Sequence, residues 1–131
     1  MIYESRHVSV AIARPPDEVY AFAADPRNLP RWATGLSGAI EEVGGRWFAE
    51  SPMGRVEVAF AARNAFGVLD HDVTFPTGET FHNPLRVVAN GDGSEVVFTV
   101  YRREGTTRQA FEADAATVLA DLRALASILE G

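Results

Sequence analysis

Residues 66–87, FGVLDHDVTFPTGETFHNPLRV, indicate a β-hairpin whose turn fixes how its strands pair. The turn, residues 75–79, has Pro76 where a type I turn needs φ near about −65° and Gly78 where the following bulge needs a left-handed residue. Counting outward from this turn gives three pairs: Val73 with Phe81, His71 with Asn83, and Leu69 with Leu85. The face that these residues share is apolar except for His71 and Asn83.

The same alternation extends to the strands on both sides of this hairpin. Turn residues at 51–54, 64–67 and 90–93 set the register of each neighbouring strand. They predict these further pairs: Trp47 with Val58, Ala49 with Val56, Phe60 with His71, Val58 with Val73, Val87 with Val96, Leu85 with Phe98, Asn83 with Val100, and Phe81 with Arg102. A slip of one residue would turn these apolar side chains to the solvent, so the set predicts one continuous antiparallel sheet. The orientation of Glu42 stays open.

Helices are expected near both ends of the chain. After an alternating strand at residues 6–13, Pro15 and Pro16 suit a first helical turn, and Asp25-Pro26 begins a second short helix that ends near Trp32. A capping box, Thr106-x-x-Gln109, predicts the start of a helix that runs to the end of the chain. Its apolar stripe comprises Phe111, Ala115, Val118, Leu122, Leu125 and Leu129. At 1.5 Å per residue this helix is roughly 35 Å long, enough to cross a whole sheet.

Length and composition set the general class of protein. With 131 residues and no cysteine, we expect a single domain over residues 1–131, without disulfides, in a reducing cytoplasm. Neither a signal peptide nor a membrane-spanning run of about 18 apolar residues is evident. A net charge of −6 argues against nucleic acid as a partner. No spacing of His, Asp or Glu predicts a metal site, and no cofactor is expected.

The opening of the chain resembles a known superfamily. Residues 14–20, RPPDEVY, and 25–32, DPRNLPRW, with the middle segments SPMGR at 51–55 and GVLDHDV at 67–73, are similar to the START-like, or SRPBCC, superfamily. The resemblance covers the whole chain and is nearest to bacterial polyketide cyclase/dehydrase-like proteins. It implies the α+β helix-grip fold: one strand, two short helices, six strands and a long helix. A curved antiparallel sheet of about seven strands would then wrap around that helix and enclose a cavity.

The register and the resemblance together predict the residues of a site. His71 and Asn83 would be polar groups in an apolar cavity, although they could instead only satisfy each other across the sheet. Arg102 would either hold a ligand carboxylate or lie at the rim with its charge in solvent. The expected ligand-binding residues are Trp47, Val58, Phe60, Val73, Phe81, Leu85, Phe98, Val100, Arg102, Phe111, Ala115 and Val118. Tyr20 and Trp32 belong either to this wall or to the core.

Three functions remain open from the sequence. The first is binding of a small hydrophobic or aromatic molecule, lipid-like or polyketide-like, by a monomer or homodimer. The second is a cofactor-independent cyclase, dehydratase or isomerase in which His71 is a general base and Asn83 or Arg102 stabilises an enolate. The third is an interaction domain, as in co-chaperone relatives of this fold, that uses Asp72 and His82 on the convex face. The register lines up Asp72, His82 and Tyr101 across this face, and it predicts a solvated cross-strand pair rather than a catalytic row.

Overall fold

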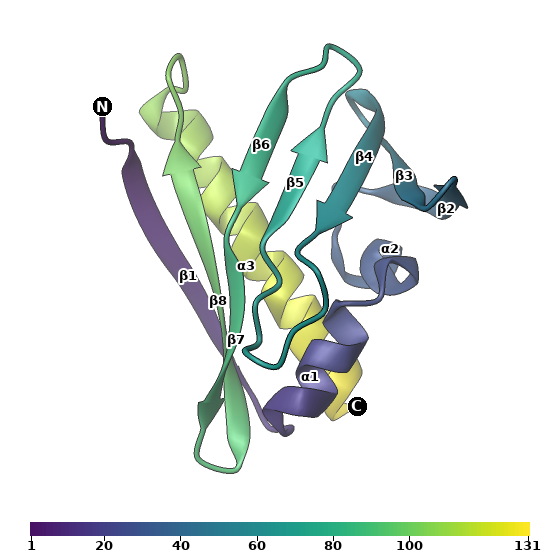
Figure 1. The fold of residues 1–131 in the computed structure, drawn as a ribbon. Coiled ribbons are helices and arrows are strands. Elements are labelled where there is room, and N and C mark those ends of the chain that lie inside the picture. The colour runs from purple at the N-terminus through teal and green to yellow at the C-terminus, as the bar shows by residue number, and fades with distance from the viewer.

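The computed structural model describes the backbone of residues 1–131 and the surroundings of every side chain except those of Ser37 and Gly38. Eight strands, three α-helices and one 3-10 helix follow in the order β1 Glu4–Ile12, α1 Pro16–Ala23, η1 Pro26–Asn28, α2 Leu29–Trp32, β2 Ser37–Val43, β3 Arg46–Ser51, β4 Gly54–Phe60, β5 His71–Thr74, β6 Thr80–Asn83, β7 Leu85–Asn90, β8 Gly93–Arg102 and α3 Arg108–Glu130 (Figure 1).

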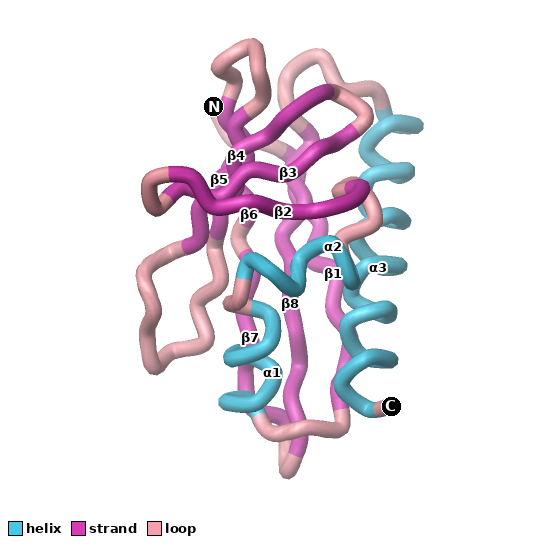
Figure 2. The backbone as a smooth tube through the Cα atoms, turned by 90° about the vertical axis from the view of Figure 1, so that its right-hand side faces the viewer, coloured by secondary structure: helices cyan, strands magenta, loops and turns pink.

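The strands form two antiparallel sheets. One has the order β1-β8-β7 and the other the order β2-β3-β4-β5-β6. Figure 2 shows the strands of the larger sheet running across those of the smaller one, with α3 alongside β1. This arrangement of antiparallel sheets against one long C-terminal helix confirms the predicted α+β helix-grip fold.

The central hairpin has the predicted register. The pairs His71 with Asn83, Val73 with Phe81, Phe60 with His71, Val58 with Val73, Trp47 with Val58, Ala49 with Val56, Leu85 with Phe98, and Val87 with Val96 are all present. In the turn, the amide of Phe75 donates to the carbonyl of Glu79 at 2.9 Å, and Gly78 has a φ of 89°. The turn residues therefore set the pairing of these strands, as expected.

The predicted continuity of the sheet is wrong at Pro84. No strand pairing joins β6 to β8 among the described residues, so the expected pairs Asn83 with Val100 and Phe81 with Arg102 do not form. Proline has no amide hydrogen to donate to a neighbouring strand and is confined to sheet edges and irregular positions. Its carbonyl still accepts a hydrogen bond from the amide of Thr99 at 3.0 Å. The break divides one expected strand into β6 and β7, which gives eight strands rather than about seven.

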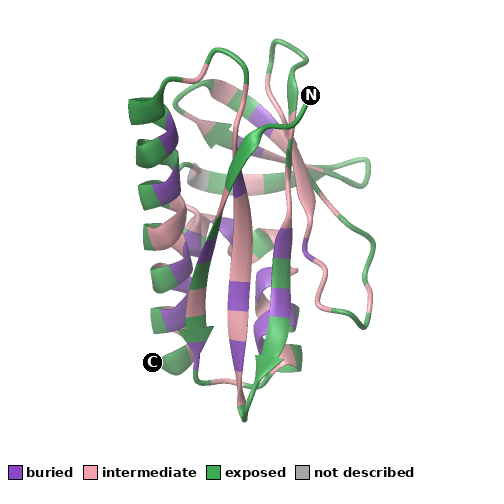
Figure 3. Ribbon diagram, turned by 90° about the vertical axis from the view of Figure 1, so that its left-hand side faces the viewer, coloured by how far each residue is buried: buried purple, intermediate pink, exposed green. Residues whose placement is uncertain are grey.

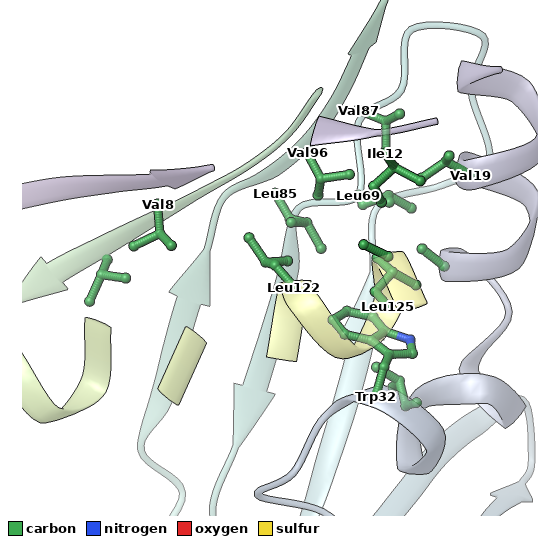
Figure 4. Packing of buried hydrophobic residues seen from close by; sticks show 14 of the residues in the cluster. Val8, Ile12, Val19, Trp32, Leu69, Leu85, Val87, Val96, Leu122 and Leu125 are labelled. Carbon is green, nitrogen blue, oxygen red and sulfur yellow. The ribbon is translucent and has the colours of Figure 1, made fainter. Parts of the chain in front are cut away.

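Helix α3 covers the inner side of the smaller sheet. Its side chains Phe111, Ala115, Leu122 and Leu125 are buried, and Val118 is half-buried, as the apolar stripe predicts. Figure 3 shows the buried residues of α3 facing the strands. Leu122, Leu125, Leu85 and Trp32 all belong to the core cluster (Figure 4). Among the described residues, no helix is long and apolar enough to cross a membrane.

The cap of α3 lies one residue later than predicted. The hydroxyl oxygen of Thr107, not that of Thr106, accepts a hydrogen bond from the amide of Ala110, at 3.0 Å. Both residues are threonine, so the sequence does not distinguish the two positions by residue type. The consequence is that Thr106 belongs to the connecting segment, where its carbonyl is free to accept a side-chain donor.

Ion pairs attach the start of α3 to β1. Arg108 donates to both carboxylate oxygens of Glu4, at 2.7 and 2.8 Å, and Arg6 donates to Glu112 at 2.7 Å. The hydrogen bond from Arg108 is the main reason why the pKa of Glu4 is lowered. These side chains are solvent-exposed, so each pair contributes little to stability. Their importance is positional, because they hold the segment between β8 and α3 in place.

Residues 61–70 form a compact loop organised by Asn64. Its side-chain amide donates to the carbonyls of Ala62 and Val68, and its oxygen accepts from the amides of Phe66 and Val68. The hydroxyl oxygen of Tyr20 accepts from the amide of Asn64 at 3.0 Å, which ties the loop to α1. Tyr20 and Trp32 are both buried, as expected of core residues.

Candidate functional site

The break at Pro84 opens a cleft between β6 and β8. On the C-terminal side of Pro84, β7 is paired with β8. On its N-terminal side, β6 is paired with β5 and, within the described structure, not with β8. The resulting cleft, here called the inner cleft, has a volume of about 250 Å³. It is lined by Asn83 from β6, by Phe98, Val100 and Tyr101 from β8, by Arg103, and by Asp114, Thr117 and Val118 from α3.

A wider hollow, here called the mouth, lies next to the inner cleft. It has a volume of about 1110 Å³ and lies between the β5–β6 hairpin, the β3–β4 turn and the segment that leads into α3. Its walls include Tyr3, Met53, Phe75, Glu79, Thr80, Phe81, residues 103–107 and Ala110. Tyr101, Arg103 and Asp114 line both spaces, so the inner cleft opens into the mouth at these three side chains.

Arg103 lies where the two spaces meet. Its guanidinium carbon is 4.4 Å from the centre of the Phe81 ring and 6.0 Å from the centre of the Tyr101 ring. Its Nη2 donates a hydrogen bond to the carbonyl of His82 at 3.0 Å. These contacts fix the plane of the guanidinium across the opening between β6 and β8.

His71 lies among aromatic side chains on the inner face of the larger sheet. Its ring centre is 5.2 Å from that of Phe60 and 5.8 Å from that of Phe98. Nδ1 lies 3.1 Å from the carbonyl oxygen of Leu69, and because a carbonyl only accepts, Nδ1 carries the proton. Burial lowers the pKa of His71 from its ordinary 6.5, so the ring is neutral at pH 7 with Nε2 as an acceptor. Asn83 is opposite His71 on β6, but no hydrogen bond between them appears in the described structure.

The other predicted site residues fall into three groups. Asn83, Phe98, Val100 and Val118 line the inner cleft, and Phe81 lines the mouth. Trp47, Val58 and Phe60 line a separate hollow of about 330 Å³ beside Pro26 of η1. Leu85, Phe111 and Ala115 are buried in the core, and Val73 is half-buried between Val58 and Phe81.

Arg102 lies outside both cleft and mouth. Its Nε donates to the carbonyl of Thr106 at 2.9 Å, and its Nη1 lies 3.5 Å from a carboxylate oxygen of Glu4. The strand β8 ends at Arg102, where it is still paired with Glu4 of β1. Arg103 is the first residue beyond the strand, and the change of chain direction there brings its side chain over Phe81 instead.

Four residues of the inner cleft were not predicted: Tyr101, Arg103, Asp114 and Thr117. Tyr101 was assigned to the outer face because one continuous sheet was assumed. Pro84 is the signal that could have found them, since a proline in a central strand predicts an interrupted ladder. Once β6 and β8 separate, residues on the edge of β8 and on the polar side of α3 border the gap.

The outer face carries the expected cross-strand pair. His82 and Asp72 are opposite each other, with Nδ1 of His82 2.7 Å from a carboxylate oxygen of Asp72. Both side chains are about half exposed. Tyr101 does not continue this row and packs instead against Tyr3, with ring centres 6.5 Å apart. Within the described residues, no group of three or more His, Cys, Asp or Glu side chains could hold a metal ion.

Comparison with known proteins identifies the family of this chain. The sequence profile of the family described as "Polyketide cyclase / dehydrase and lipid transport" matches residues 5–127. The chain belongs to this family. A search of the curated proteins finds no match to this family member.

Solved structures similar to this family member share its fold at low sequence identity. The KanY protein is 16% identical, with a TM-score of 0.75 and full coverage of both chains. A protein from Chromobacterium violaceum is 15% identical over 97% of this chain and 98% of its own, with a TM-score of 0.71. DynU16, from the dynemicin biosynthetic locus, is 19% identical over 96% of this chain, with a TM-score of 0.71. The chain spans about half, 47%, of the length of DynU16.

Proposed function

We propose that the protein binds a small hydrophobic or aromatic molecule in the inner cleft, with part of the molecule extending into the mouth. The observation that supports this proposal is the separation of β6 from β8 at Pro84, which leaves apolar side chains beside an opening. Phe98, Val100 and Val118 provide the apolar walls, and Asn83 is a polar group on the β6 side. Arg103, Asp114 and Thr117 add further polar groups beside these apolar walls, and small-molecule sites use such groups to orient a ligand. The family description, which includes lipid transport, supports a ligand of this class.

Filling the inner cleft tests this proposal. Val118 is a half-buried residue of α3 that lines the cleft, so Val118→Trp is expected to occupy the space that the ligand needs. The wild-type melting temperature should rise with a ligand from a panel of aromatic polyketide-like, fatty and steroid molecules. A ligand at a hundred times its Kd adds about 2.7 kcal/mol of stability. The variant should lose this shift while keeping its circular dichroism spectrum.

Val43→Trp is the matched control. Val43 is 52% exposed at the end of β2 and lies outside cleft and mouth, so the same substitution there should leave the ligand-induced shift unchanged. The proposal would be contradicted if no member of the panel stabilised the wild-type protein. It would also be contradicted if Val118→Trp bound the ligand as tightly as the wild type does.

A second candidate function is proton transfer by His71, which is not among the lining residues of cleft or mouth but whose ring centre is 5.8 Å from that of Phe98, a residue of the cleft. The protonated Nδ1 is held by the carbonyl of Leu69, which leaves the lone pair of Nε2 for a substrate proton. If the bound molecule is converted, His71→Gln should reduce turnover by about 100-fold or more. The wild-type rate should fall as the pH is lowered through the His71 pKa, which burial places below 6.5, because protonation removes the base. Turnover that survives the substitution with an unchanged pH profile would exclude His71 as the base.

A further inference from the structure

Arg103 is a positively charged group without an acidic partner among the described contacts. Most arginines of the chain lie within 4.0 Å of a carboxylate, namely Arg6, Arg14, Arg27, Arg46, Arg55, Arg86, Arg102 and Arg108. Arg103 instead has the rings of Phe81 and Tyr101 and the carbonyl of His82 around it. Its guanidinium therefore has an ordered orientation and a charge that no ion pair of the described structure neutralises.

The contacts of Arg103 leave donors available. A guanidinium has five N–H groups, and among the described contacts Arg103 uses one of them, in the hydrogen bond from Nη2 to the carbonyl of His82. The contact with Phe81, in which the guanidinium carbon lies 4.4 Å from the ring centre, is a cation–π interaction and is not among the hydrogen bonds of the N–H groups. A planar edge with free donors is the arrangement that binds a carboxylate through two parallel hydrogen bonds.

We propose that the ligand is an amphipathic carboxylic acid whose carboxylate binds Arg103 and whose apolar body enters the inner cleft. This inference rests on the proposed function, because it assigns a ligand class to the same site. The position of Arg103 between the mouth and the inner cleft places the charged head at the wet end of the site. The body then contacts Phe98, Val100 and Val118, within a volume that suits one or two rings or a short alkyl chain.

Three carboxylates near Arg103 oppose an anionic ligand. Glu79 and Glu104 are exposed residues of the mouth, and Asp114 on α3 lines both spaces. Exposed charges in water are screened within about 8 Å at physiological salt. A bidentate hydrogen-bonded pair with an arginine that lies on aromatic rings acts at contact distance, where screening is weakest. We therefore expect the attraction between a ligand carboxylate and Arg103 to exceed the repulsion from the three carboxylates. Asp114 should still reduce the affinity for an acid.

Paired probes that differ only in charge test this ligand class. The two pairs are 2-naphthoate with 2-naphthamide, and decanoate with decanamide, titrated at pH 7 and physiological ionic strength by calorimetry. The wild type should bind at least one acid about 10-fold to 100-fold more tightly than its amide, as expected for hydrogen bonds to a charged group. Arg103→Met should abolish this preference and leave the affinity for the amide within about 2-fold.

Two further variants separate a binding role from a structural one. Arg31→Met is the matched control, because Arg31 also lies over an aromatic ring, 5.2 Å from Phe22, but outside cleft and mouth. It should leave the acid preference intact. Asp114→Asn removes the opposing carboxylate and should strengthen acid binding by about 2-fold to 5-fold. This variant keeps Arg103 in place, so it tests the proposal even if Arg103→Met fails to fold.

The outcomes are distinguishable. If amides bind as tightly as acids, or if Arg103→Met retains the acid preference, the inference is overturned while the proposed apolar site stands. If neither member of either pair binds the wild type at all, the proposed function fails for ligands of this size, and the inference fails with it. An acid preference that Arg103→Met abolishes, Arg31→Met preserves and Asp114→Asn increases would establish a carboxylate-binding site at Arg103.

Discussion

Replacing Phe111 with Ala is expected to lower the free energy of unfolding by about 4 kcal/mol. Phe111 is completely buried in the first turn of α3 and belongs to the core cluster. The guanidinium groups of Arg6 and Arg108 lie 5.0 and 5.8 Å from the centre of its ring. The substitution therefore removes apolar contacts, leaves a cavity and weakens the packing of both arginines where α3 meets β1.

Urea unfolding followed by circular dichroism measures this effect, with Phe66→Ala as the matched control. Phe66 is 82% exposed in the loop of residues 61–70, so the same change of side chain there should alter stability by about 0.5 kcal/mol or less. A difference of less than about 1 kcal/mol between the two variants would mean that the start of α3 contributes little to the fold. In that case the role assigned to Phe111 is wrong.

Replacing Gly67 with Ala is expected to cost about 3 kcal/mol. Gly67 has a φ of 71°, which is unfavourable for any residue with a Cβ, and an added Cβ would lie 2.1 Å from the carbonyl oxygen of Val87. That contact involves two backbone segments, so neither can move away by a side-chain rotation. Relief of the clash would break the hydrogen bond from the amide of Val87 to the carbonyl of Gly67, now 2.9 Å long.

Gly91→Ala separates the two contributions to this cost. Gly91 has a similar φ of 58°, but no atom lies within 4 Å of a Cβ added there. Its substitution should cost only the strain of a left-handed backbone, about 1 kcal/mol. Equal losses of stability in the two variants, measured by urea unfolding, would show that the close approach of Gly67 to β7 has no energetic importance.

The parts of the fold that depend on short-range turn chemistry could be predicted from the sequence. Pro76 and Gly78 set the register of the β5–β6 hairpin, and the turns at residues 51–54, 64–67 and 90–93 set that of β3, β4, β7 and β8. The break at Pro84 was missed because the apolar alternation continues on both sides of it. The missing amide hydrogen of Pro84 thus interrupted the strand, although the apolar alternation continued through it.

The candidate site was predictable only in part, because its residues depend on that break. Asn83, Phe98, Val100 and Val118 lie on positions that the sequence assigns to the inward face, and they line the inner cleft; their part in binding stays a prediction. Arg103 and Asp114 border the opening only because β6 and β8 separate. The sequence pointed to Arg102 because a continuous ladder would pair it with Phe81, and Arg103 was not considered. The structure ends β8 at Arg102, and strand ends are the least certain part of a prediction from sequence. The assignment of His71 and Asn83 as functional groups stays a prediction.

The division of the sheet at Pro84 also affects how selective the protein is for ligand size. No backbone hydrogen bond joins β6 to β8 among the described residues, so a modest widening of the gap breaks no ladder hydrogen bond, although it would disturb the side-chain hydrogen bond from Arg103 to the carbonyl of His82. The backbone can therefore accommodate a wider ligand at this point at a low cost in free energy. The few side chains at the opening, above all those of Phe81, Tyr101 and Arg103, then determine which ligand widths the protein accepts. A small number of substitutions there would change the range of accepted molecules while both sheets keep their pairing.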